Sequence, residues 1–330
     1  MIKRKQVIIL FFLWFFMPEL SFAVPQDTIP DTNNVAIIDR SHSLFNNIVT
    51  NPAYAGILGG HNILLNAEID NSFFTFKNMY TPQQYNLAYD VVFGKKKNCA
   101  VGALFSYTTG GIIQKTFGEI IYAQNINLTK NLRFYHKLRL GVSVSLNRAI
   151  TNWHLTSFGD QIDPKYGFVW NTAESPYDSI RCYINFNWGM WYHNPVFYLG
   201  FTIKNLTEPD FSFYGTSKIP REFIVSTGGS IKIDDNFSLH PAFNMSIVKG
   251  FGRKLSTYSP SIMGSYKNNY FLGLSYKDLN KITVHAGGVA LKSIFLSVAY
   301  GIFTHTDLMG FGYPAYIGGD IRISINNKPK

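Results

Sequence analysis

The most constraining feature of this chain is a strict alternation of apolar and polar residues that recurs in long segments. In residues 138–147, leucine or valine at every second position interleaves with arginine, glycine, serine and asparagine. The segments 84–93, 237–246 and 317–325 follow the same rule. Because successive side chains of a β-strand point to opposite faces, each segment predicts a strand with one apolar and one polar face.

The length of the segments favours a membrane barrel over a soluble β-sandwich, whose strands also alternate. The segments run about nine to fifteen residues, whereas soluble strands average five or six, and a tilted strand needs about 9–11 residues to cross a bilayer. In lipid an open sheet edge would leave backbone groups unpaired, so the sheet must close. The sequence therefore predicts an all-β fold, a transmembrane antiparallel β-barrel.

Composition agrees with strands rather than helices as the membrane-crossing elements. Aromatic residues make up 16% of the chain and charged residues only 15%. Beyond the N-terminal region no apolar run approaches the ~18 residues of a transmembrane helix. The aromatic excess fits the two girdles that barrels place at the lipid–water interfaces.

Tiling the alternation along the chain predicts about 14 strands, an even number as in single-chain bacterial barrels. The predicted strands are 62–70, 83–93, 98–108, 116–128, 132–147, 180–193, 195–205, 221–233, 236–250, 254–267, 269–278, 282–291, 293–301 and 316–325. Tight connections, such as Gly94–Lys97 and Thr129–Asn131, alternate with mostly longer ones, such as 109–115, 148–179 and 206–220. Tight turns are typical of the periplasmic side, so both termini are expected there.

The N-terminus has the order of a secretory signal peptide. Lys3–Lys5 form a basic head, Val7–Met17 an apolar stretch too short to span a bilayer as an anchor, and Ser21–Ala23 a small-x-small cleavage site. We therefore expect residues 1–23 to be removed and 62–330 to form the barrel. The intervening residues 24–61 are predicted to form a periplasmic segment that packs at or inside the barrel mouth and could partly plug it.

Charge and cysteine content exclude other classes. The net charge is +10, but the basic residues are dispersed and the chain is predicted to be exported. Lipid headgroups or an acidic partner are therefore better expectations than nucleic acid. Cys99 and Cys182 fall on the apolar side of their strands, which predicts small lipid-facing residues rather than a disulfide.

No pattern indicates catalysis, a cofactor or a metal. The eight histidines are scattered without ligand spacing, and no serine and histidine share a register beside an acid or amide, so an enzyme is not expected. The polar registers predict that the following residues line the lumen: Asp90, Arg139, Arg181, His240, Asp320 and Arg322. Their mixed charges favour a cross-bridged interior over a charge-selective pore, and leave open whether the lumen is plugged.

Two surface features are candidate contact sites. The turn carrying Lys95, Lys96 and Lys97 is a candidate partner contact, with an ordinary solvated turn as the simpler interpretation. The long loop 148–179 carries Trp153 and Trp170, and is a candidate extracellular site for an exported protein.

A family resemblance rests on motifs spread over roughly residues 42–300. The segment 44–56 ends in Asn51-Pro52-Ala53-Tyr54-Ala55-Gly56 and resembles the opening of the PorP/SprF family. The segments 201–209, 220–229, 240–243 and 270–276 resemble further family motifs in the same order. The chain departs from the family at the end of its first strand and in its closing motifs, and so looks like a divergent member.

The resemblance implies an outer-membrane barrel of Bacteroidetes, distantly similar to the FadL-type fold and part of the type IX secretion and gliding-motility apparatus. It implies a non-enzymatic accessory or anchor for large adhesins with C-terminal sorting domains. Implied partners are the periplasmic ring and a peptidoglycan-binding protein. The alternative function is a transporter of a small or hydrophobic solute.

The same motif has two interpretations. Asn51, Pro52 and Gly56 are turn-forming residues, so the motif can be a turn that aims the chain into the first strand. It can also be a periplasmic docking site, in which Ala53 and Tyr54 would take part. The structural interpretation is favoured.

Overall fold

Long antiparallel strands make up most of the described chain. The computed structural model describes residues 48–70, 83–94, 97–110, 113–129, 136–153, 159–163, 165–168, 179–213, 217–250, 253–277, 281–291, 293–303 and 315–325. The predicted signal peptide, residues 1–23, and the first part of the predicted periplasmic segment lie outside these ranges.

The first half of the chain has a short inner turn, η1 (Pro52–Tyr54, a 3-10 turn), followed by strands. The strands are β1 (His61–Asp70), β2 (Gln83–Phe93), β3 (Cys99–Gly110), β4 (Ile113–Asn127), β5 (Lys137–Thr151), β8 (Ile180–His193) and β9 (Phe197–Lys204). Between β5 and β8 lie η4 (Gly159–Gln161) and a small separate hairpin of β6 (Ile162–Asp163) and β7 (Gly167–Phe168).

The second half continues in the same way. Its strands are β10 (Glu222–Gly229), β11 (Ile231–Lys232), β12 (Phe237–Gly250), β13 (Arg253–Tyr266), β14 (Tyr270–Lys277), β15 (Lys281–Leu291), β16 (Ile294–Phe303) and β17 (Ala315–Ile325).

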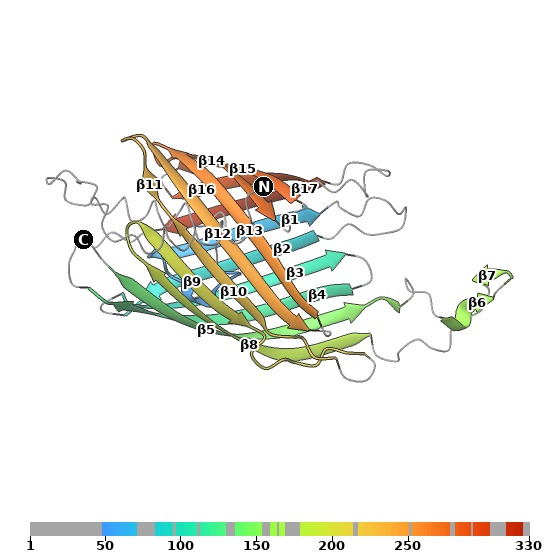
Figure 1. Ribbon diagram of the computed structural model, residues 1–330. Helices are drawn as coiled ribbons and strands as arrows, with labels where there is room; N and C mark the ends of the chain where they lie inside the picture. The colour runs from blue at the N-terminus through green and yellow to red at the C-terminus, as the bar shows by residue number, and fades with distance from the viewer. Residues whose placement is uncertain are drawn as a thin grey trace. The chain divides into compact units, whose positions relative to one another are not determined.

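The sheet closes on itself. Neighbours along the sheet pair antiparallel, β10 pairs with both β9 and β12, and β1 pairs with β17. The result is a closed antiparallel barrel of 14 strands, with the short β11 extending the line of β10 beside β12 (Figure 1). The predicted fold class and strand number are confirmed.

The alternation in the sequence becomes an inside and an outside. Along β3, Ala100, Leu104 and Ser106 are buried, whereas Val101 and Phe105 are exposed, Phe105 to 50%. An apolar surface of this extent would be unfavourable in water but suits a bilayer. Cys99 and Cys182 both lie in the outward register and are not bonded to each other.

Two predicted connections have the wrong length. The expected tight turn at Thr129–Asn131 is a longer connection, because β4 ends at Asn127 and β5 begins only at Lys137. The expected loop 109–115 is short, because β3 runs to Gly110 and β4 begins at Ile113. Pairing there continues through polar and glycine residues, as in the Thr109–Gln114 pair. Alternation of hydrophobicity does not mark such pairs.

Candidate functional site inside the barrel

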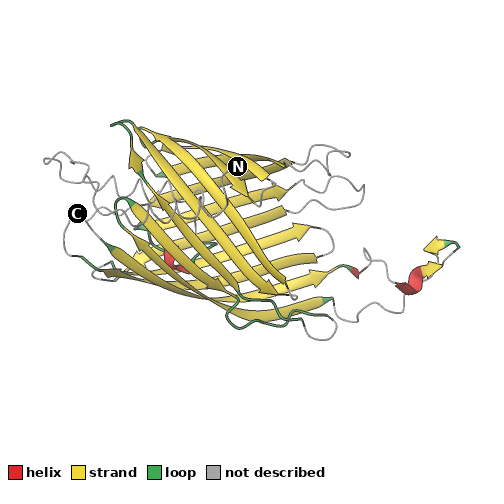
Figure 2. Cartoon of the chain, in the orientation of Figure 1, coloured by secondary structure: helices red, strands yellow, loops and turns green. Residues whose placement is uncertain are grey.

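The residues that precede β1 form an inner segment, Ile48–Gly60, which packs against the inward face of the barrel. Its centre is η1, which contacts β4, β5 and β8 (Figure 2). Asn51 caps this turn, since its side-chain oxygen accepts a hydrogen bond of 2.8 Å from the Ala53 nitrogen. The Asn51 amide nitrogen donates to the Met190 carbonyl at 3.2 Å, which ties the turn to β8.

Glycines in the wall make room for the inner segment. A Cβ on Gly141 of β5 would overlap the backbone of Pro52 and Ala53. A Cβ on Gly189 of β8 would overlap the Asn51 side chain. These two glycines are paired directly across the two strands, so the wall has a shallow recess where η1 sits.

Three charged side chains of the wall hold the backbone of the inner segment. Arg139 on β5 is buried and donates to the carbonyls of both Ala53, at 3.0 Å, and Ala55. Asp90 on β2 accepts a 2.7 Å hydrogen bond from the Gly56 nitrogen. Lys204 on β9 donates to the Val49 carbonyl at 3.1 Å. Hydrogen bonds to charged groups contribute about 1.5–3 kcal/mol each, so these contacts fix the segment firmly.

Aromatic rings pack beside the turn. Tyr54 meets Trp191 edge-on with ring centroids 5.4 Å apart, and Trp191 stacks on Tyr198 at 4.7 Å. Gly200 and Gly228 admit this stack, because a Cβ on either would lie 2.6 Å from a ring carbon. All three rings are nearly inaccessible to solvent.

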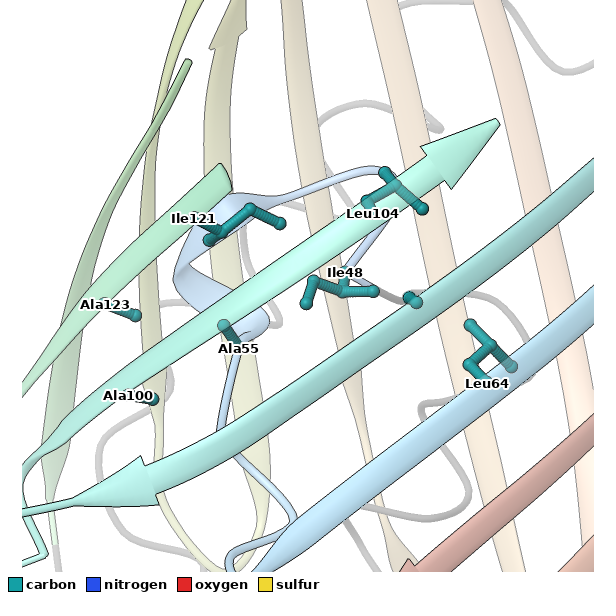
Figure 3. Close-up of a cluster of buried hydrophobic side chains, with 8 residues drawn as sticks. Ile48, Ala55, Leu64, Ala100, Leu104, Ile121 and Ala123 are labelled. Carbon is teal, nitrogen blue, oxygen red and sulfur yellow. The ribbon is translucent and has the colours of Figure 1, made fainter. Parts of the chain in front are cut away.

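An apolar cluster contacts the inner segment at two points. Ile48 and Ala55 pack with inward-facing residues of β1, β2, β3 and β4, among them Leu64, Leu104 and Ile121 (Figure 3). The motif 51–56 is therefore enclosed by polar contacts and apolar packing together.

Hydrogen-bonded side chains cross the remaining inward face. The Asn66 amide donates to Asp320 at 2.6 Å and accepts from Asn86 at 2.6 Å, and Ser297 donates to Asp320 at 3.0 Å. Farther around the wall, Asn187 donates to Glu119 at 3.0 Å. Such contacts brace neighbouring strands from within.

The sequence-predicted residues occupy different places. Arg139 and Asp90 meet at the inner segment, and Arg322 lines with Asp90 a cavity of about 10 Å³ beside Tyr54. Asp320 belongs to the network around Asn66. His240 is buried and lies 2.9 Å from the Ser265 hydroxyl.

The candidate surface residues are less fully placed. Lys97 is exposed and has a positive φ of 49°, whereas Lys95 and Lys96 lie outside the described residues. Trp153 packs edge-on against Phe213 with centroids 5.3 Å apart, and Trp170 lies outside the described residues.

The loop between β9 and β10 is more ordered than the sequence indicates. Arg181 donates to the Ser212 carbonyl at 2.7 Å, and Asp210 accepts from the Ser212 and Ser217 backbone nitrogens, each at 3.0 Å. These backbone hydrogen bonds lower the pKa of Asp210 below its usual value. The loop and Trp153 thus form one packed feature at the barrel end opposite the start of β1.

Sequence reasoning missed the wall side of this site. Gly141 and Gly189 each lie in an alternating strand, where the sequence does not distinguish a glycine that makes room for η1 from any other small inward-facing residue. The sequence does not identify Trp191 as a contact of the inner segment either, because alternation assigns apolar residues to the lipid side. The Ser275 hydroxyl lies 2.8 Å from His285, a serine–histidine contact that the sequence did not predict.

Within the described ranges, no helix has the length and apolarity needed to cross a membrane. Nor do the residues that the structure describes contain a group of three or more His, Cys, Asp or Glu arranged to hold a metal ion.

Solved structures share the barrel fold at low sequence identity. The toluene transporter TodX of Pseudomonas putida matches with a TM-score of 0.50 and 10% identity, over 84% of this chain and 93% of that one. The toluene transporter TbuX of Ralstonia pickettii gives a TM-score of 0.47 and 12% identity over 84% and 93%. A FadL homologue of Pseudomonas aeruginosa gives 0.43 and 10% over 86% and 93%. At 10% identity the likeness to TodX shows the fold alone.

The sequence comparison is more specific. No curated protein matches the chain significantly. The family model described as "Type IX secretion system membrane protein PorP/SprF" matches residues 37–312, which include the inner segment and all strands but the last. With its closed outer-membrane barrel and this match over most of its length, the chain belongs to the PorP/SprF family.

Proposed function

We propose that this protein is a non-enzymatic accessory or anchor barrel of a type IX secretion system. The observation that carries the proposal is the inner segment, together with the family match. A family motif is engaged in hydrogen bonds to β2, β5 and β8 inside the barrel. A barrel whose interior is occupied in this way is suited to present its two rims to other proteins.

The two rims would have different partners. We place the end at which β1 begins in the periplasm, where the Lys95–Lys97 turn would meet the periplasmic ring or a peptidoglycan-binding partner. The opposite rim, with the loop 205–221 and Trp153, would hold an exported protein that carries a C-terminal sorting domain. The burial of Asn51–Gly56 favours a structural role for this motif over a docking site.

The direct test is recovery of partners from native membranes. The tagged protein is extracted from outer membrane in mild detergent, captured, and analysed by mass spectrometry, with an unrelated tagged barrel from the same cells as control. We expect ring lipoproteins, or a large exported protein with a C-terminal sorting domain, with this protein only. A triple Lys→Glu variant of residues 95–97 should lose the periplasmic partners and keep the exported one.

The rival function is passage of a small or hydrophobic solute, which the likeness to the TodX fold makes worth measuring. Recovery of the barrel without partners, together with conductance of the intact protein in planar bilayers, would overturn the secretion proposal in favour of transport.

A further inference from the structure

Two buried polar atoms of the barrel wall lack a hydrogen-bond partner among the described residues, and both belong to side chains that line one small cavity. They are Nη1 of Arg322 on β17 and Oδ1 of Asn62 on β1. The two side chains are only 6% and 3% exposed. Because a buried polar group without a partner is costly, a donor and an acceptor beside the same cavity point to a small molecule that serves both.

The orientation of the Asn62 amide is fixed by its neighbours. Its nitrogen donates to the Gly59 carbonyl at 3.1 Å and to Oδ2 of Asp90 at 3.0 Å. Both partners can only accept a hydrogen bond, so the amide cannot be turned around. The Asn62 oxygen is therefore the atom that still needs a donor.

Three neighbouring strands bring the polar side chains of this cavity together. Asn62 pairs directly with Asp90 across β1 and β2, and Arg322 pairs with Leu64, the next inward residue of β1. Asp90 lines the same cavity. Its carboxylate already accepts from Asn62 and from the Gly56 nitrogen, and it has lone pairs for a further donor. The cavity therefore lies beside one donor and two acceptors.

We propose that this cavity binds one water molecule, which accepts a hydrogen bond from Arg322 and donates one each to Asn62 and Asp90. The volume of about 10 Å³ is on the scale of the roughly 10–15 Å³ that a single buried water needs. Three hydrogen bonds are also typical of such waters. A metal cation would be repelled by the guanidinium, and an anion such as chloride by the carboxylate, so charge selects a neutral molecule that both donates and accepts.

The water joins the two ends of the sheet to the inner segment. Arg322 lies on the last strand and Asn62 on the first, while Asp90 also holds the Gly56 nitrogen of the inner segment. Tyr54 of the same segment lines the cavity. The site is thus complete only when β17 has closed the barrel on β1 and the inner segment is in place.

The first test is the electron density of the wild-type protein, crystallised from detergent at a resolution that shows ordered water. We expect one isolated peak with the density of a single oxygen, within about 3.2 Å of Arg322 Nη1, Asn62 Oδ1 and an Asp90 oxygen. Absence of a peak, a peak with the anomalous signal of an ion, or a protein side chain filling the cavity would overturn the proposal.

Hydroxyl-radical footprinting with X-rays tests the same site in solution, because the radicals form from water that lies beside a side chain. Tyr54 lines the cavity and Tyr198 does not, although both are buried, with 4% and 0% exposure. In the wild type we expect Tyr54 to be oxidised several-fold faster than Tyr198. Equal rates at the two tyrosines would contradict a bound water beside Tyr54.

Arg322→Met removes the donor to the water and keeps most of the side-chain volume, so the oxidation rate of Tyr54 should fall several-fold. Arg148→Met is the matched control, because it removes the same charge from the outward face of β5 and should leave this rate unchanged. An unchanged rate in Arg322→Met would count against the site. If Arg322→Met loses the heat-modifiable mobility of a folded barrel, the wild-type density and the comparison of the two tyrosines decide the matter.

Discussion

At the scale of single residues, Arg139 is the contact of the inner segment whose loss we expect to be most costly. It is buried and donates to two backbone carbonyls, of Ala53 and Ala55, that precede β1. A shorter side chain would leave those carbonyls without their donor in a site that water reaches poorly. The desolvation of an unsatisfied group makes this more costly than the loss of one surface contact.

Arg139→Ala should therefore lower the free energy of unfolding by about 3 kcal/mol, the scale of hydrogen bonds to a charged donor. Urea unfolding of the barrel in detergent, followed by heat-modifiable mobility, measures the change. Arg148→Ala on the same strand is the control, because Arg148 is exposed and in the outward register. It should change stability by less than about 0.5 kcal/mol, and equal losses in both variants would contradict the assignment.

The wall glycines give a second residue-level prediction. Gly141→Ala should destabilise the barrel by about 1–3 kcal/mol, the usual cost of overpacking, because the new methyl meets the backbone of η1. Gly118→Ala, whose Cβ has open space around it, should be nearly neutral. If both variants unfold at the same urea concentration, the inner segment does not rest against β5.

How much of the structure can be predicted from the sequence depends on what the alternation of apolar and polar residues can indicate. It located all fourteen strands, because one face meets lipid and the other does not. It could not distinguish inward residues that touch the inner segment from those that touch other polar groups. Alternation assigns Asp90 and Arg139 to the lumen, yet nothing in their strands shows that they converge on the segment before β1. That convergence depends on sheet closure, which joins residues far apart in the chain.

At the scale of elements, the loop 205–221 is held at its centre by Asp210. Asp210→Ala removes the acceptor for two backbone nitrogens and should free the loop. Trypsin cleavage after Lys218 or Arg221 should become several-fold faster, with the barrel itself intact. Asp235→Ala in the turn before β12 is the control, because that turn lies outside this loop. Unchanged cleavage would show that Arg181 and Trp153 order the loop without Asp210.

The same loop should respond to acid in a defined direction. The pKa of Asp210 is lowered by the Ser212 and Ser217 hydrogen bonds, so the ionised carboxylate is the form that orders the loop. The stabilisation of the loop by the ionised Asp210 carboxylate is complete above the carboxyl pKa of the unfolded chain, about 4. It is lost as the pH falls through the lowered pKa of Asp210 in the folded protein. Hydrogen exchange of the two amides, corrected for intrinsic rate, should show equal protection at pH 7 and 5 and less at pH 3.

At the scale of the whole molecule, barrel and inner segment are separable in principle. The fourteen strands pair around the full circumference without the inner segment. Deleting residues 48–60 should therefore leave a barrel that still shows heat-modifiable mobility but is less stable. In planar bilayers this variant should conduct more than the intact protein. Equal conductance would mean that other residues control the passage.

The position of Asn51 also dictates an order of assembly. Its partner on β8, Met190, lies 139 residues farther along the chain. The segment that is synthesised before every strand therefore cannot complete its contacts until β8 has joined the growing sheet, since long-range contacts must await chain closure. The inner segment thus reaches its final position late, and its contact with Met190 indicates that the sheet has grown at least to β8. In a chain truncated before β8, this segment would keep its hydrogen bonds to Asp90 and Arg139 but lack the one between Asn51 and Met190.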